Sequence, residues 1–355
     1  MMMAAGTGGH VFPALAVAKQ LQQQGIQVSW LATPVGMENR LLKNHNIPIY
    51  QINIQGVRGN GLIRKLAAPF KILGATLSAM RYMKQLKVDA VAGFGGYVAG
   101  PGGLAARALG IPVLIHEQNA VAGFTNTQLS RVAKTVCQAF PNTFPNSDKI
   151  VTTGNPVREE ITATLSPAWR YQEREKAGLP IRILIVGGSL GAQALNECVP
   201  EALKQLNVAL DVYHQCGQNH AEATQARYAH KPDHLQVEVQ PFIEDMAKAY
   251  SDADLIICRA GALTVTEVAT AGVAAVFVPL PSAVDDHQTA NAKFLADLGA
   301  AKICPQASMT PESLTTLLTP LMNRQLLSEM AVKARQQAQP DATQHVVRLI
   351  QALFE

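Results

Sequence analysis

Short apolar runs alternate with amphipathic stretches along the whole chain. In the first such unit, apolar residues recur at helical spacing from Ala14 to Leu21. Pro13 suits the first turn of this helix, and Gly25 is a stop signal before a strand at 27–32. An alternation of strands and helices is typical of parallel sheets that are covered by helices on both faces.

Both halves of the chain repeat this pattern. In the first half we predict further strands at 47–54, 90–93, 113–116, 135–139 and 149–152, which gives a sheet of six or seven strands. In the second half the predicted strands are 181–186, 209–215, 235–239, 255–258, 274–278 and 301–304. The fold class is therefore α/β, with two Rossmann-like, doubly wound parallel-sheet domains.

A polar, charge-rich passage at 158–180 separates the two halves. We place the first domain at residues 1–158 and the second at residues 159–340. The sequence Pro340-Asp341-Ala342-Thr343 is typical of a helix start, and we expect the helix at 341–355 to pack back on the first domain. The length of 355 residues agrees with two domains, because one hydrophobic core rarely covers so long a chain.

The composition describes a globular protein, with 48% hydrophobic and 16% charged residues. The net charge of +4 suits an anionic ligand or membrane surface but is too diffuse to indicate a nucleic-acid partner. The 5 cysteines form no CxxC pair, which indicates reduced, buried thiols. The chain starts without a signal-peptide pattern, and its longest apolar stretch, 88–115, is interrupted by glycines, prolines and Arg107. We therefore expect a soluble or peripheral protein.

Three glycine-rich turns stand where a strand is followed by a helix. They are Gly6-Thr7-Gly8-Gly9-His10, Gly93-Phe94-Gly95-Gly96-Tyr97 and Gly187-Gly188-Ser189-Leu190-Gly191. Glycines at such a place expose backbone N–H groups at the positive end of a helix dipole. The sequence therefore predicts anionic, phosphorylated ligands.

A dinucleotide cofactor is the first alternative for these turns. A nicotinamide or flavin site needs an acidic residue near the end of the second strand to bind the ribose. The chain has Leu31-Ala32-Thr33 at that place in the first half and Tyr213-His214-Gln215 in the second. The Walker pattern GxxxxGK[ST] is absent as well. We therefore predict neither a dinucleotide cofactor nor an ordinary ATPase.

His10 directly follows the first glycine turn and precedes the predicted helix. The helix dipole favours a neutral imidazole there, which could act as a general base toward a hydroxyl group. A simple helix cap or a phosphate contact is the alternative role. The motif His116-Glu117-Gln118-Asn119 follows another predicted strand and brings polar groups to the carboxyl edge of the sheet.

The second half carries a further strand-to-helix junction, 259–267. N–H groups after Gly261 can meet a diphosphate, and Glu267, one turn later, can accept hydrogen bonds from two sugar hydroxyls. A surface glutamate that merely complements the helix dipole is the alternative. Asp285-Asp286-His287-Gln288 lacks a third well-spaced ligand, so we predict no metal site.

The stretch 62–72 mixes apolar and basic residues and continues to Arg81, Lys84 and Lys87. Apolar anchors surrounded by basic side chains suit an anionic bilayer surface. An ordinary helix that faces the core fits the same pattern. The residues of a membrane-docking segment would be Ile63, Arg64, Lys65, Leu66, Phe70 and Lys71.

Six motifs in order resemble one family over nearly the whole chain. They are the segments 6–13, 95–101, 116–119, 154–158, 187–192 and 259–267. The family is the MurG N-acetylglucosaminyltransferases, which convert lipid I to lipid II in bacterial peptidoglycan synthesis. The resemblance implies a GT-B fold, in which two Rossmann-like domains face each other across a cleft. It also implies a peripheral enzyme at the cytoplasmic face of the inner membrane.

The resemblance further implies partners and residue roles. The donor would be UDP-N-acetylglucosamine, the acceptor undecaprenyl-pyrophosphoryl-MurNAc-pentapeptide (lipid I), and the surface partners anionic inner-leaflet lipids and other cell-wall assembly proteins. No cofactor is implied. The donor site would comprise Thr7, Gly8, Gly9, Asn119, Arg158, Ser189, Ile243, Ala262, Leu263, Thr264, Val265, Thr266, Glu267 and Gln288. The acceptor pyrophosphate would meet Gly8, Gly9, Gly95, Gly96 and Tyr97.

Within that donor site, Ile243 would meet uracil through its backbone and Glu267 the ribose. Ser189 and the 262–264 turn would meet the diphosphate. The expected reaction is an inverting single displacement, in which the muramyl C4 hydroxyl, deprotonated by His10 or by a nearby carboxylate or water, attacks the anomeric carbon and expels UDP. Helix N-termini and Arg158 would stabilise the leaving diphosphate. A UDP-N-acetylglucosamine 2-epimerase and a non-catalytic nucleotide-sugar or polyprenyl-phosphate binding protein are the alternatives.

Two departures from the family pattern carry expectations of their own. The chain begins only five residues before Gly6, with Ala5 where the family has glycine, so the first strand is expected to be short or poorly held. Leu190 stands where the family turn often has glutamine, which leaves the backbone donors of that turn in place.

Overall fold

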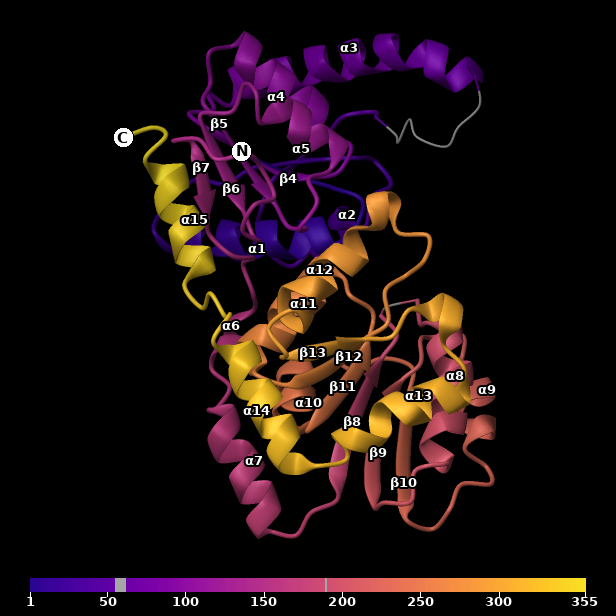
Figure 1. Cartoon of the computed structure of the whole chain (residues 1–355). Coiled ribbons are helices and arrows are strands. Elements are labelled where there is room, and N and C mark those ends of the chain that lie inside the picture. The colour runs from indigo at the N-terminus through magenta and orange to yellow at the C-terminus, as the bar shows by residue number, and fades with distance from the viewer. Residues whose placement is uncertain (55–61, 189) are drawn as a thin grey trace. The chain divides into compact units, whose positions relative to one another are not determined.

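The computed structural model describes residues 1–54, 62–188 and 190–355, and for residues 62–67 and 284 it describes the backbone only. The chain divides into two compact units (Figure 1). Unit 1 comprises Met1–Val157 and Gln339–Glu355, and unit 2 comprises Arg158–Ala338. The predicted division lies after residue 158, with the last helix in the first domain.

Within the described residues, unit 1 contains a 7-stranded parallel sheet of order β3-β2-β1-β4-β5-β6-β7. Its strands are β1 (Met2–Ala4), β2 (Trp30–Ala32), β3 (Ile49–Gln51), β4 (Val91–Gly95), β5 (Val113–Glu117), β6 (Thr135–Gln138) and β7 (Ile150–Thr152). Its helices are α1 (Gly8–Gln23), α2 (Glu38–Leu41), α3 (Leu62–Gln85), α4 (Ala99–Ala108), α5 (Phe124–Leu129) and α15 (Ala342–Gln351).

The first strand is short, as expected, but it is well held. β1 is three residues long and lies in the middle of the sheet, between β2 and β4. Met2 and Ala4 pack into the core beneath α1 and α15, and Met3 packs into the core beneath α3 and α4. Figure 1 shows α3 and α4 on one side of these strands and α1 on the other. Pairing on both edges and burial on both faces therefore compensate for the short length.

Unit 2 contains, among its described residues, a 6-stranded parallel sheet of order β10-β9-β8-β11-β12-β13. Its strands are β8 (Ile181–Val186), β9 (Leu210–Gln215), β10 (Leu235–Gln240), β11 (Leu255–Cys258), β12 (Ala274–Phe277) and β13 (Ala301–Ile303). Its helices are α6 (Glu159–Thr162), α7 (Pro167–Lys176), α8 (Gln193–Lys204), α9 (Ala221–Arg227), α10 (Met246–Asp252), α11 (Ala262–Ala271), α12 (His287–Ala296), α13 (Pro311–Leu318) and α14 (Arg324–Arg335), with 3-10 turns η1 (Val284–Asp286), η2 (Gln306–Ser308) and η3 (Thr319–Leu321). The predicted α/β class with two parallel sheets is confirmed.

The passage 158–180 begins at the boundary between the two units and forms α6 and α7, which were not predicted, and Arg170 and Tyr171 of α7 are buried in unit 2. One expectation about local structure was wrong. Pro13 lies in the sixth position of α1 rather than in its first turn, because the helix already begins at Gly8. His10 therefore belongs to the first helical turn itself.

Candidate active site

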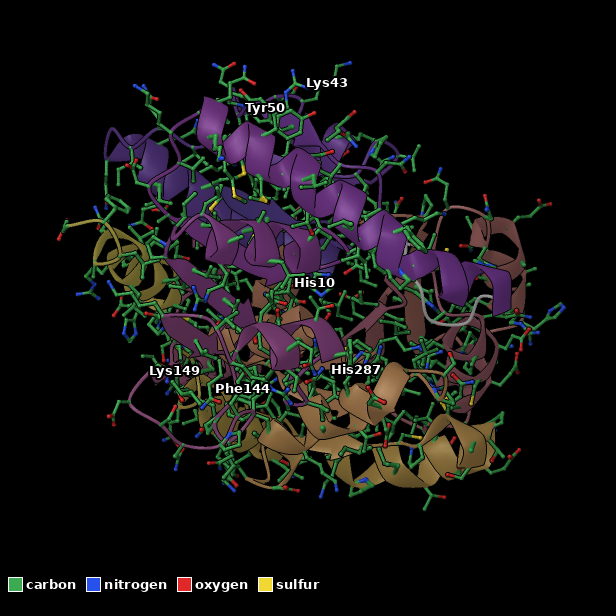
Figure 2. The ribbon with its side chains drawn as sticks, turned by 90° about the horizontal axis from the view of Figure 1, so that it is seen from above. His10, Lys43, Tyr50, Phe144, Lys149 and His287 are labelled. Carbon is green, nitrogen blue, oxygen red and sulfur yellow. The ribbon has the colours of Figure 1, made fainter. Side chains whose placement is uncertain are left out.

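The first glycine turn connects β1 to α1. Gly6 has φ +96°, a left-handed conformation that glycine adopts without strain, and Thr7 is the N-cap of the helix. The Thr7 hydroxyl lies 3.3 Å from His10 Nδ1, so it orients the imidazole ring. Figure 2 labels His10 in this first turn of α1. The first N–H groups of a helix have no partner within it, so those that follow Thr7 can meet an anion.

The second glycine turn lies directly against the first. β4 pairs with β1, and a Cβ atom at Gly95 would lie 2.7 Å from His10 Cδ2. A Cβ atom at Gly96 would lie 2.1 Å from the carbonyl oxygen of Ala5. Both glycines also have positive φ values, +103° and +80°. The structure thus brings Gly95 and Gly96 together with His10, while the Tyr97 side chain next to them is 54% exposed.

Glu38 holds the first turn through the backbone of Gly6, and it is not among the residues predicted from the sequence. Its carboxylate is fully buried and accepts hydrogen bonds from Gly6 N at 3.3 Å and from Thr33 N and Oγ1, both at 2.9 Å. The nearby residue that could have indicated a buried role for Glu38 is Gly36, because a Cβ atom there would lie 2.0 Å from a Glu38 oxygen. An acidic residue does therefore follow the second strand, but its carboxylate accepts hydrogen bonds from the backbone of Gly6 and Thr33, so it is not placed as the ribose-binding residue of a dinucleotide site.

The His116–Asn119 motif begins inside a strand instead of following one. β5 extends to Glu117, and both His116 and Glu117 are buried. The Glu117 carboxylate accepts hydrogen bonds from Asn119 N at 3.0 Å and Nδ2 at 3.2 Å, and from Asn126 Nδ2 at 2.9 Å. Burial lowers the pKa of His116 to about 4, so this imidazole is neutral near pH 7. The network fixes the direction of Asn119 at the edge of the sheet.

The third turn, in unit 2, is held by a neutral amide. Gln215, at the end of β9, accepts from Gly188 N at 3.1 Å and donates to the Gly188 carbonyl at 3.0 Å. Gly188 and Gly191 have φ values of +86° and +79°, and a Cβ atom at Gly191 would lie 2.1 Å from the carbonyl of Cys216. The predicted phosphate contact Ser189 lies outside the described residues.

The start of α11 brings together several predicted donor residues. Gln288 Oε1 accepts from Ala260 N at 3.3 Å, so this side chain lies beside the N-terminus of the helix. Ala262, Val265 and Thr266 have buried side chains, because the helical period turns them toward the core. Contact of these three with a ligand would have to use their backbone. Leu263, Thr264 and Glu267 are partly exposed.

Glu267 is held by two donors. Arg158 Nη2 lies 3.1 Å from Oε1, and the Tyr250 hydroxyl lies 3.0 Å from Oε2. The Glu267 side chain is 15% exposed and that of Arg158 is 44% exposed. Burial raises the pKa of Glu267, while the charge of Arg158 and the two hydrogen bonds act in the opposite direction.

A hollow of about 490 Å³ lies beside Arg158. Its lining includes Ile161 of α6 and the residues 244–248 that directly follow Ile243. Ile243 is 5% exposed, so its backbone is the part that can meet a ligand. The hollow therefore adjoins Arg158 and the segment after Ile243, the residue that was predicted to meet uracil.

Arg170, like Glu38, is not among the residues predicted from the sequence. Its buried guanidinium donates to five backbone carbonyls, two of them the last carbonyls of α11, Ala271 at 2.6 Å and Gly272 at 2.7 Å. It also donates to the carbonyls of Tyr250 at 3.2 Å and Ser251 at 2.8 Å in α10. One cation thus caps the C-terminal parts of the helices that carry Tyr250 and Glu267.

The predicted membrane segment lies at the start of α3. The backbone of Ile63, Arg64, Lys65 and Leu66 is helical, but their side chains lie outside the described residues. Phe70 is 78% exposed, and Lys71 is exposed as well. Two further leucines on this helix, Leu73 and Leu77, are 57% and 56% exposed, while Ala75, Ala79 and Met83 face the core. The helix therefore has both a core face and an outward apolar stripe.

Among the described residues, no helix has the length and apolar character needed to cross a membrane. The same residues contain no group of three or more His, Cys, Asp or Glu side chains that could hold a metal ion.

Comparison with known proteins gives close relatives. Residues 1–138 match the N-terminal domain of glycosyltransferase family 28, and residues 182–346 match its C-terminal domain. A UDP-N-acetylglucosamine--N-acetylmuramyl-(pentapeptide) pyrophosphoryl-undecaprenol N-acetylglucosamine transferase of Acinetobacter baumannii is 83% identical over 353 residues, covering 99% of this chain and 97% of that protein.

Solved structures agree with this relationship. The crystal structure of Acinetobacter baumannii MurG is 80% identical, covers 99% of both chains and superimposes with a TM-score of 0.89. A UDP-GlcNAc 2-epimerase from Neisseria meningitidis, bound to UDP-GlcNAc, has a TM-score of 0.66 at 14% identity and covers 99% of both chains. The second likeness shows a shared fold alone.

Proposed function

The chain belongs to glycosyltransferase family 28 and, within it, to the MurG N-acetylglucosaminyltransferases, and from this premise we propose how its residues divide the reaction. The enzyme transfers N-acetylglucosamine from UDP-N-acetylglucosamine to lipid I, which gives lipid II. In our proposal unit 1 binds the acceptor and the membrane, and unit 2 binds the donor.

The proposed general base is His10. Its ring is oriented by the Thr7 hydroxyl and packs against the backbone of Gly95. The imidazole takes the proton of the muramyl C4 hydroxyl, the oxygen forms a bond to the anomeric carbon, and the bond from that carbon to UDP breaks. The adjoining turns around Gly8 and Gly96 receive the acceptor's pyrophosphate through backbone N–H groups.

In unit 2 the proposed donor site is the start of α11 with Glu267 and Arg158. The partly exposed carboxylate accepts hydrogen bonds from the ribose hydroxyls, as the two oxygens of a fixed glutamate can. The hollow beside Arg158 takes the nucleoside. The N–H groups at the helix start and the third glycine turn stabilise the negative charge that develops on the leaving diphosphate.

The exposed apolar stripe of α3 is the proposed membrane anchor. Phe70, Leu73 and Leu77 recur at intervals of three and four residues, so they share one face of the helix. Lys71 and Arg81 on the same helix suit anionic headgroups of the inner leaflet. This arrangement supports a peripheral position on the cytoplasmic face of the membrane. Contact with other cell-wall assembly proteins stays a prediction.

The observation that carries the base assignment is the placement of His10 where both unit 1 turns meet. We expect His10→Ala to lower kcat about 100-fold or more, a typical contribution of general base catalysis. The measurement is disaccharide formation from labelled UDP-N-acetylglucosamine and a lipid I analogue. The Kd for UDP should stay within about twofold of wild type. His345→Ala, in α15 of the same unit, is the matched control, and unchanged turnover of His10→Ala would remove His10 as the base.

A further inference from the structure

Tyr250 is a buried tyrosine whose hydroxyl group forms a hydrogen bond to the partly exposed Glu267 of the proposed donor site. The residue is 1% exposed, and its Oη donates to Glu267 Oε2 at 3.0 Å. The other carboxylate oxygen, Oε1, accepts from Arg158 Nη2 at 3.1 Å. Each oxygen of Glu267 is thus held by one protein donor and keeps a second acceptor position for a ligand.

The two donors differ in how firmly they are fixed. The Arg158 side chain is 44% exposed, so solvent competes for its hydrogen bond. The ring of Tyr250 is enclosed by the core, and the carbonyl of the same residue is bound by Arg170 at 3.2 Å. Tyr250 is therefore the rigid member of the pair, and it limits the rotation of the Glu267 carboxylate.

We propose that Tyr250 is a positioning residue for the donor: it fixes the Glu267 carboxylate in the direction from which that group accepts two adjacent hydroxyls of the donor sugar. This inference rests on the proposed ribose role of Glu267. The phenol does not touch the donor; it acts through the carboxylate, and its removal affects binding of the donor more than the chemical step.

The same contact controls the charge of Glu267. Burial raises the pKa of this carboxyl group, and the charge of Arg158 and the hydrogen bonds from Tyr250 and Arg158 lower it. Loss of one donor to the charged form raises the pKa further. The protonated form then appears at a higher pH, and a neutral carboxyl group accepts hydrogen bonds from hydroxyls less strongly.

The test is Tyr250→Phe, which keeps the buried ring and removes the hydroxyl alone. We expect the donor KM to rise about 10-fold at pH 7, the lower end for loss of one hydrogen bond to a charged group, with kcat within about twofold. The pH below which the donor KM increases should move upward, because the variant lacks a hydrogen bond that favours the charged carboxylate. A variant with an unshifted pH profile and an unchanged donor KM overturns the proposal.

Two further variants separate this proposal from its premise. Tyr228→Phe is the matched control, because Tyr228 is also buried and its hydroxyl lies 3.0 Å from His214 Nδ1. It should leave the donor KM and its pH profile unchanged even if it lowers the Tm. Glu267→Gln tests the premise: an unchanged donor KM there refutes the ribose role. A raised KM in Glu267→Gln, together with wild-type behaviour of Tyr250→Phe, refutes the positioning role alone.

Discussion

Arg170→Met is predicted to destabilise unit 2 strongly, although Arg170 is not among the proposed ligand contacts. The methionine keeps a long apolar side chain but none of the guanidinium donors. Those donors now bind five carbonyl groups in three segments of the unit. Their loss leaves the last carbonyls of α11 without the cation that caps them.

The magnitude follows from the acceptors that have no second donor among the described contacts. The Tyr250 carbonyl also accepts from Ala253 N, and Leu165 is 57% exposed, so water can replace the donor to its carbonyl. The carbonyls of Ser251, Ala271 and Gly272 depend on Arg170 in the hydrogen bonds described. A buried carbonyl that loses its partner costs about 1 kcal/mol or more, so three cost about 3 kcal/mol. The cation's own desolvation, which lowers the pKa of Arg170, offsets part of the loss. We expect unit 2 to lose about 2–4 kcal/mol.

Calorimetry and urea denaturation of the whole chain measure this loss. In a unit of this size, such a change lowers the Tm by about 4–16 °C. Trp30 is fully buried in unit 1, so its fluorescence in a Trp169→Phe background follows unit 1 and should report little change. Arg227→Met is the matched control, because that arginine is 42% exposed and its carboxylate partner is 4.0 Å away. A loss below about 1 kcal/mol in Arg170→Met would refute the capping argument.

Three further predictions concern unit 1. Gly96→Ala should lower the free energy of unfolding, measured by urea denaturation, by about 2–4 kcal/mol, because its Cβ would meet the Ala5 carbonyl at 2.1 Å. Gly25→Ala, where φ is also positive at +79° but no atom lies near the added Cβ, should lower it less. The pKa of His116 is about 4 in the folded chain and near 6.5 in the unfolded chain, so the unfolded chain binds the proton first as the pH falls. The free energy of unfolding should therefore be highest above pH 6.5 and lower by about 2 kcal/mol at pH 5; equal free energies at pH 7 and 5 would contradict this. Phe70→Ser should weaken co-sedimentation with anionic vesicles about 10-fold, and undiminished binding would exclude Phe70 as an anchor.

The limits of the central strands were predictable because each apolar run in the sequence covers the same residues that pair with the neighbouring strands. β8 and β11 have the predicted limits, since both are paired on two sides and each has a run of buried residues. The edge strand β3 covers only Ile49–Gln51 of the predicted 47–54, although Ile52 and Ile54 are buried. Burial alone produces an apolar run, and the ends of an edge strand depend on a single neighbour that the local pattern does not reveal.

Glu38 and Arg170 could not be predicted for a related reason. Each is one of several charged residues in its stretch, and nothing in the local sequence distinguishes it from the solvated ones. The partners that bury them are remote: Gly6 precedes Glu38 by 32 residues, and Gly272 follows Arg170 by 102. Both partners are backbone groups, which carry no residue-specific signal. The glycine turns themselves were visible, because positive φ values and close backbone approach favour one residue type.

The two units support their glycine turns with different charges, which bears on the task of each turn. Glu38 places a buried carboxylate behind Gly6, whereas Gln215 places a neutral amide behind Gly188. A negative charge behind a turn opposes the positive end of the helix dipole and so weakens that end as a site for an anion. The neutral amide leaves the dipole at the third turn undiminished. Electrostatics therefore favours the third turn as the place for a diphosphate, and we predict that binding of the acceptor's pyrophosphate in unit 1 depends more on the Gly95–Gly96 turn than on the first turn.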